Sequence, residues 1–104
     1  MNNIEMVNEM VKGSQETLDR FLGILLSQIE AGKPAVFMAT LVATFKAKLT
    51  AERKLQELIT DNEYIVLGWG PEPYREMYEL CLDAIATCNE ILEKQLSKIE
   101  KEEV

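Results

Sequence analysis

The sequence predicts an all-α protein, folded as an elongated bundle of three long amphipathic helices. Apolar residues recur at helical spacing over three long stretches, and glycine and proline gather at only two places, Gly32–Pro34 and Gly68–Pro73. The chain has 104 residues, of which 47% are hydrophobic and 28% charged, as in an ordinary globular domain. We therefore expect a single helical domain over residues 1–104.

The first helix is expected over residues 4–31. Two rows of side chains repeat every seven residues, as in a coiled-coil seam. Ser14 could cap a fresh start at Gln15, so a kink there is the alternative to a continuous helix. The first row is Ile4, Val11, Leu18 and Leu25, the second is Val7, Ser14 and Phe21, and Leu22 and Ile29 widen the stripe.

The second helix is expected over residues 34–60, because Gly32 can end the first helix and Pro34 suits a first turn. Lys48 and Glu52 interrupt its apolar face one turn apart, where they can pair. A buried ion pair rarely recovers its desolvation cost. The pair therefore lies at a subunit seam, lines a ligand-binding cavity, or reaches water. The predicted core face is Phe37, Leu41, Phe45, Leu55 and Ile59, flanked by Met38, Val42, Leu49 and Leu58.

The third helix is expected over residues 73–101. In the first half of this helix the apolar arc covers more than half of the circumference, so we expect cover from more than one side. Helices of this length reach ~40 Å, more than a compact domain of this size needs. Both features predict that the bundle completes its core by self-association, as a homo-oligomer and most simply a dimer. The row is Tyr78, Ile85, Leu92 and Ile99, broadened by Cys81, Leu82, Cys88 and Leu96, and Met77, Leu80, Ala84 and Ile91 extend the arc.

Aromatic residues gather in the connection over residues 61–73 and just after it. Four of the seven aromatic residues, Tyr64, Trp69, Tyr74 and Tyr78, fall within fifteen positions. Tyrosine and tryptophan dominate binding hot spots. Trp69 either plugs the open end of the bundle or contacts a partner. Residues 64–67 form a short extended piece or a ragged helix end.

Composition excludes several functions. A net charge of −7 and a pI of 4.6 argue against direct binding to nucleic acid or an anionic membrane. The chain has no histidine, which removes the commonest general base, and no phosphate-binding glycine motif. Cys81 and Cys88 would lie about 10 Å apart on one helix face, too far for a disulfide, so we expect free thiols and a cytoplasmic protein.

The carboxylates of the third helix are the remaining metal candidates. Glu76, Asp83 and Glu90 form a row on one helix, and a magnesium site needs carboxylates from at least two sides. We interpret the row as a solvated face. No catalytic residue, metal or cofactor is therefore predicted.

The favoured function is a non-catalytic interaction protein: an adaptor, an assembly factor or an inhibitor of another protein. It would bind itself through its helices and another protein through the loop region. The alternative is a sequestering protein for an anionic, nucleotide-like ligand held by Lys48, Arg53 and the loop aromatics. The candidate binding residues are Tyr64, Trp69, Tyr74, Arg75, Lys48, Glu52 and Arg53.

Overall fold

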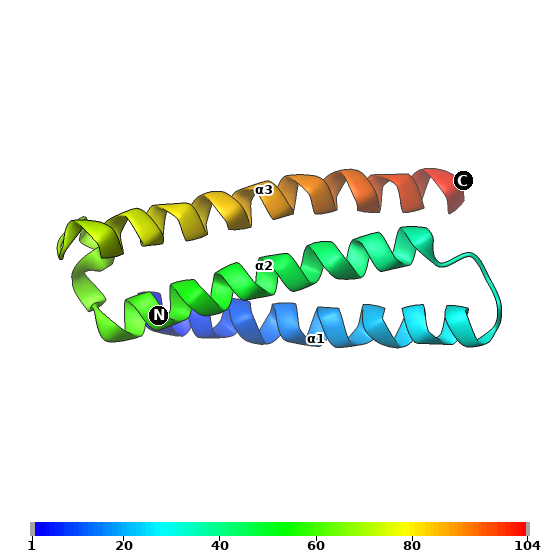
Figure 1. Cartoon of the computed structure of the whole chain (residues 1–104), viewed down its shortest axis with the longest axis horizontal. Coiled ribbons are helices and arrows are strands. Elements are labelled where there is room, and N and C mark those ends of the chain that lie inside the picture. Colours follow the sequence, from blue (N-terminus) through cyan, green and yellow to red (C-terminus); the bar gives the residue numbers. More distant parts are fainter. Residues whose placement is uncertain (1, 104) are drawn as a thin grey trace.

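A computed structural model describes the backbone of residues 2–103 and the side chains of residues 2–99. The described chain consists of α1 (Asn3–Glu30), α2 (Val36–Asp61), the short 3₁₀ helix η1 (Glu63–Leu67) and α3 (Glu72–Glu103). The three long helices run up, down and up along one axis, and the molecule measures 51 × 25 × 21 Å (Figure 1). The predicted all-α class and elongated shape are confirmed.

α1 begins where the sequence provides a cap. The Asn2 side chain accepts a hydrogen bond of 2.8 Å from the backbone N–H of Glu5, which satisfies one of the free donors of the first turn. The helix then continues through Ser14 to Glu30, so Ser14 does not cap a fresh start at Gln15. Gly32, with a φ of +68°, turns the chain toward α2.

The connections differ in detail from the sequence expectation. α2 begins at Val36, two residues later than predicted, because Pro34 remains in the turn. Residues 63–67 form η1 rather than an extended piece, which matches the expectation of a ragged helix end. At the start of α3, the Pro71 carbonyl accepts hydrogen bonds from the backbone N–H groups of Tyr74 and Arg75.

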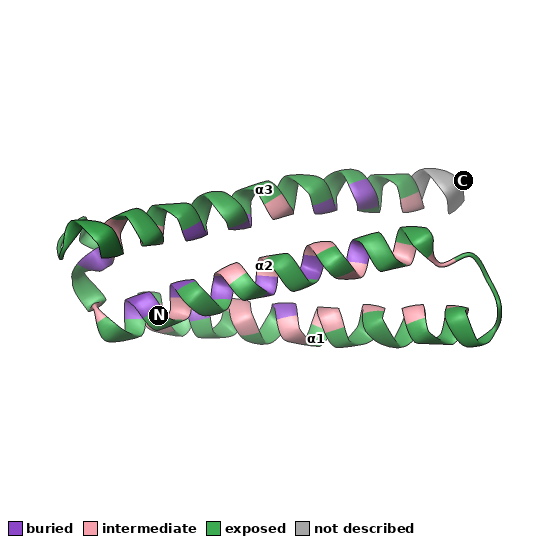
Figure 2. Cartoon of the chain, viewed as in Figure 1, coloured by how far each residue is buried: buried purple, intermediate pink, exposed green. Residues whose placement is uncertain are grey.

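α2 is the central helix, since it packs against α1 and against α3. Buried residues gather along α2 and on the sides of the other helices that face it (Figure 2). The core forms two hydrophobic clusters, one near each end of the bundle. The cluster near η1 contains Val7, Leu55, Leu58, Ile59, Ile65, Cys81 and Ile85, and the other contains Leu41, Phe45 and Leu92.

The core is open between α1 and α3, because these two helices hardly approach each other along the described residues. A groove of about 210 Å³ lies between them near η1. Its lining is almost entirely apolar: Asn3, Met6, Val7 and Met10 of α1, Leu55 and Ile59 of α2, Val66 of η1, and Tyr78 and Leu82 of α3.

This arrangement corrects part of the predicted core. Phe37 is 39% exposed, because it lies in the first turn of α2 at the end of the bundle. Only α2 packs closely on α1. Because α2 covers a narrower face than the predicted apolar stripe of α1, Leu22 and Ile29 at the side of that stripe are exposed. On α3, six residues of the predicted apolar arc are exposed: Met77, Leu80, Leu82, Ala84, Ile91 and Leu96.

Candidate functional site

The loop between α2 and α3 is built around η1 and two glycines. η1 ends at Gly68, whose φ of +81° is the left-handed conformation that glycine adopts without strain. The backbone N–H of Trp69 then donates to the Tyr64 carbonyl, at 3.3 Å. This bond turns the chain back on itself and brings the Trp69 ring against the Tyr64 ring, with centroids 5.7 Å apart.

The large side chains of this loop are not covered by the rest of the bundle. Trp69 is 62% exposed, Tyr64 58% and Leu67 63%. Trp69 therefore does not plug the end of the bundle, and the buried residue of η1 is Ile65 instead. We call the exposed set Tyr64, Leu67, Trp69 and Tyr74 the loop patch.

Asn62 and Arg75 hold the loop in place. At Gly70, whose φ is +112°, a Cβ atom would stand 2.6 Å from the Asn62 side-chain nitrogen. The segment after Trp69 therefore packs closely against the end of α2. The Arg75 guanidinium donates to the Gly68 carbonyl at 3.4 Å and is half-buried, so this residue anchors the loop rather than extending from it.

Beside the loop patch lies a pocket of about 220 Å³. Its lining combines the buried apolar residue Leu58 with the acidic residue Asp61 and the aromatic residue Tyr74. Asn62 and Pro71 complete the lining. Ligand pockets usually measure ~300–1,000 Å³, so this one suits a single side chain rather than a whole nucleotide.

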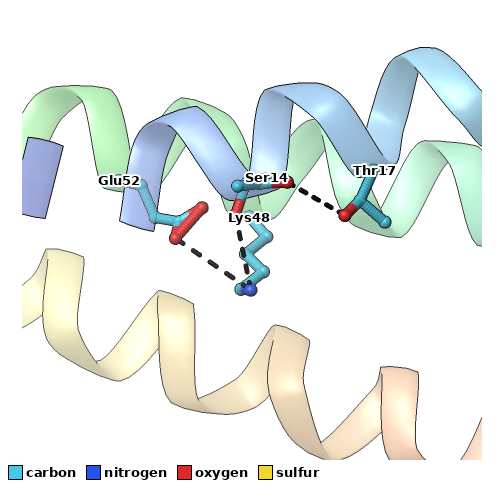
Figure 3. A network of polar contacts seen from close by, with 5 residues as sticks. Ser14, Thr17, Lys48 and Glu52 are labelled. Atoms are coloured by element: carbon cyan, nitrogen blue, oxygen red, sulfur yellow. Dashed lines mark hydrogen bonds and ion pairs between the residues drawn. The ribbon is translucent and has the colours of Figure 1, made fainter. Parts of the chain in front are cut away.

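The second predicted feature, Lys48 and Glu52, lies in the middle of the bundle between the two hydrophobic clusters. Glu52 is fully buried, and its Oε2 lies 4.0 Å from the Lys48 Nζ. The Lys48 ammonium also donates to the Ser14 hydroxyl of α1 at 3.5 Å (Figure 3). The Lys48 side chain keeps 18% of its surface exposed, so the ammonium reaches the edge of the core while the carboxylate does not.

No described group donates a hydrogen bond to either oxygen of Glu52. Burial raises the pKa of this carboxyl group above its ordinary value, and the positive charge of Lys48 offsets that shift only in part. Neither residue lines the pocket beside the loop patch or the groove between α1 and α3, and Glu52 is fully buried by the chain's own helices. The pair is therefore an internal polar layer of the chain's own core.

The structure does not bring the predicted ligand-binding residues together. Arg53 lies on the surface, where its guanidinium donates to the Gln15 side chain of α1. Lys48 is thirteen residues from Asp61, about 20 Å along α2, so it cannot share a site with the loop aromatics. Tyr64, Trp69, Tyr74 and Arg75 do belong to one loop region.

Other potentially reactive groups are dispersed. Cys81 and Cys88 are free, as predicted, with Cys81 buried and Cys88 half-buried. Glu76, Asp83 and Glu90 are exposed on α3. Within the described part of the chain, no three Asp, Glu or Cys side chains gather as a metal site would require. Nor is any described helix long and apolar enough to cross a membrane.

Sequence reasoning missed three residues that shape the site. Asp61, Asn62 and Leu67 are ordinary in the sequence, and only the fold of the loop places them beside the aromatic residues. Ser14 stands in a predicted apolar row of α1, and a hydroxyl at such a core position is the sequence signal for a polar layer.

No protein-family model matches the chain, and comparisons with curated proteins and with solved structures find no match.

Proposed function

We propose that this chain is a non-catalytic interaction protein that binds another protein through the loop patch. The observation that carries the proposal is the tilted contact between the Tyr64 and Trp69 rings, since both side chains stay exposed although a backbone hydrogen bond holds their residues together. Ordered aromatic side chains offer a large contact area at low entropic cost, which is the character of binding hot spots.

The test compares the proteins captured by the wild type and by two variants. Trp69→Ala removes the most prominent contact residue of the loop patch. Val36→Ala is the matched control, because Val36 is 81% exposed at the opposite end of the bundle. We expect at least one protein from the native source to be retained by the wild type and by Val36→Ala but lost with Trp69→Ala. Identical capture by all three would contradict the proposal.

We further propose that the protein self-associates through the groove between α1 and α3. The groove exposes Met6 and Leu82 above the buried side chains of Val7, Leu55 and Ile59, so a second copy would complete the core there. Large exposed apolar surfaces on soluble proteins commonly mark such interfaces.

Two substitutions on opposite flanks of α3 test this interface. Leu82 lines the groove, whereas Leu80 does not line it and is 61% exposed. Two residues apart on a helix, their side chains point in nearly opposite directions. Light scattering at micromolar concentration should show a dimer for the wild type and for Leu80→Lys, and a monomer for Leu82→Lys. A monomeric wild type would end the proposal, and a monomer with Leu80→Lys alone would move the interface to the other flank.

A further inference from the structure

Charge is unevenly distributed along the bundle. If each long helix is divided at its middle, residues 2–16 and 49–88 form the half that carries the loop. This half holds eleven acidic and four basic residues, whereas residues 17–48 and 89–103 hold seven of each. Residues 2–16 and 49–88 lie together at the end of the bundle that carries the loop (Figure 1), so their net charge of −7 equals that of the whole sequence.

Within this acidic half, the pocket beside the loop patch has the chemistry of a cation site. The Asp61 carboxylate ends α2, where the negative end of the helix dipole also favours a positive charge. Asp61 has no ion-pair partner among the described residues. Tyr74 also lines the pocket and is 55% exposed, and its aromatic ring is a group on which an alkyl chain or a guanidinium can stack.

The nearest basic residue in the sequence does not neutralise the negative charge of Asp61 in this pocket. Arg75 is the one basic residue in the segment 55–93, and it donates to the Gly68 carbonyl instead of lining the pocket. The pocket also adjoins the loop patch, because Asn62 lines it and contacts Gly70, which follows Trp69. One ligand segment can therefore cover the aromatic residues and enter the pocket together.

We propose that the partner surface is a basic protein segment, whose arginine or lysine side chain enters the pocket between Asp61 and Tyr74 while neighbouring apolar side chains cover Trp69. This inference rests on the proposed function, since it names the chemistry of the partner at the same site. A nucleic acid or an anionic membrane would be repelled by the net charge of this half.

The experiment selects random peptides displayed on phage against the wild-type protein, after depletion on the Trp69→Ala variant to keep peptides that need the loop patch. We expect the enriched peptides to carry arginine or lysine beside aromatic or aliphatic residues. One enriched peptide is then synthesised, both as selected and with its arginine replaced by the neutral isostere citrulline.

Binding is measured against Asp61→Asn and against Asp19→Asn, an exposed carboxylate of α1 in the other half. A charge-assisted hydrogen bond at Asp61 predicts an affinity loss of about tenfold or more for Asp61→Asn, and less than about twofold for Asp19→Asn. The citrulline peptide should lose a similar factor on the wild type but almost nothing further on Asp61→Asn, because the two changes remove one interaction.

The outcomes separate the two proposals. Enriched peptides that need Trp69 but lack basic residues, or equal losses for Asp61→Asn and Asp19→Asn, would overturn this inference alone. Peptides that bind the wild type and Trp69→Ala equally, even after depletion, would overturn the loop patch as the contact surface. If nothing is enriched, both proposals fail.

Discussion

The Lys48 ammonium lies 4.0 Å from the Glu52 carboxylate one turn further along α2, yet that carboxylate is fully buried and accepts no hydrogen bond from any described group. The basic partner reaches the edge of the core, and the acidic one remains inside. Charged groups that are buried without complete pairing destabilise a fold unless they become neutral.

The first prediction follows from the direction of the pKa shift at Glu52. Burial raises this pKa above 4.5, so the folded state binds a proton more readily than the unfolded state does. The contribution of Glu52 to stability is therefore fully present below about pH 4.5 and falls as the pH rises through the folded-state pKa. Glu52→Gln should remove this decline, because a neutral amide at this position does not titrate.

Urea denaturation at a series of pH values between ~4.5 and ~7.5 measures this effect. Glu57→Gln is the control, because the Glu57 side chain lies on the surface of the same helix and is 67% exposed. The control should keep the wild-type pH dependence. If Glu52→Gln keeps it as well, burial of Glu52 is not its source.

The second prediction concerns Trp69. Because this side chain is 62% exposed, Trp69→Ala should change the free energy of unfolding by less than about 1 kcal/mol. Phe45→Ala, in the core beside Phe21, should instead cost about 3–5 kcal/mol. Trp69 is the single tryptophan, so the tryptophan fluorescence of the protein reports on this residue alone. Because Trp69 is exposed, that emission should resemble that of tryptophan in water. A strongly blue-shifted emission together with a large stability loss would place Trp69 in a core.

The third prediction concerns two glycines at which substitution by alanine should have opposite effects on stability. Gly70→Ala should destabilise the protein by about 1–3 kcal/mol, since its φ is +112° and a Cβ would collide with Asn62. Gly23 lies within α1, and a Cβ there would meet no atom within 4 Å. Gly23→Ala should therefore stabilise by about 0.5–1 kcal/mol. Thermal denaturation of both variants is the measurement, and two shifts in the same direction would contradict it.

The fourth prediction concerns the thiols. Burial raises the pKa of Cys81, against the opposing charge of Lys54, so little thiolate is present at neutral pH. In a Cys88→Ala variant, the remaining Cys81 should react with a disulfide reagent at least about tenfold more slowly in the folded protein than in urea. The Cys81→Ala variant, which retains the half-buried Cys88, provides the comparison. Rapid labelling of native Cys81 would show that α3 opens readily from α2.

The sequence was sufficient for the three helices because each carries a long apolar row at helical spacing. It also placed Leu41, Phe45, Leu55 and Ile59 correctly in the core of α2. Phe37 follows the same spacing but is exposed, because periodicity identifies the face of a helix and not where its neighbours end.

The loop could be located from the sequence but not described in detail. Gly68, Gly70 and Pro71 announce a turn, whereas the pocket depends on how Asn62 meets Gly70 across the loop. That contact joins positions eight residues apart through irregular backbone, for which no repeating pattern exists. The wide apolar arc of α3 was visible, but the side on which it meets α2 depends on how the helices pack.

The central position of α2 also determines how the bundle unfolds locally and how it folds. α1 and α3 both pack against α2 and hardly against each other, so either outer helix can detach without first releasing the other. Amide hydrogen exchange should therefore be slowest along α2 and faster, at separate rates, along α1 and α3. Because the helices in contact are neighbours in the chain, few long loops must close during folding, and the acquisition of the native state should be fast.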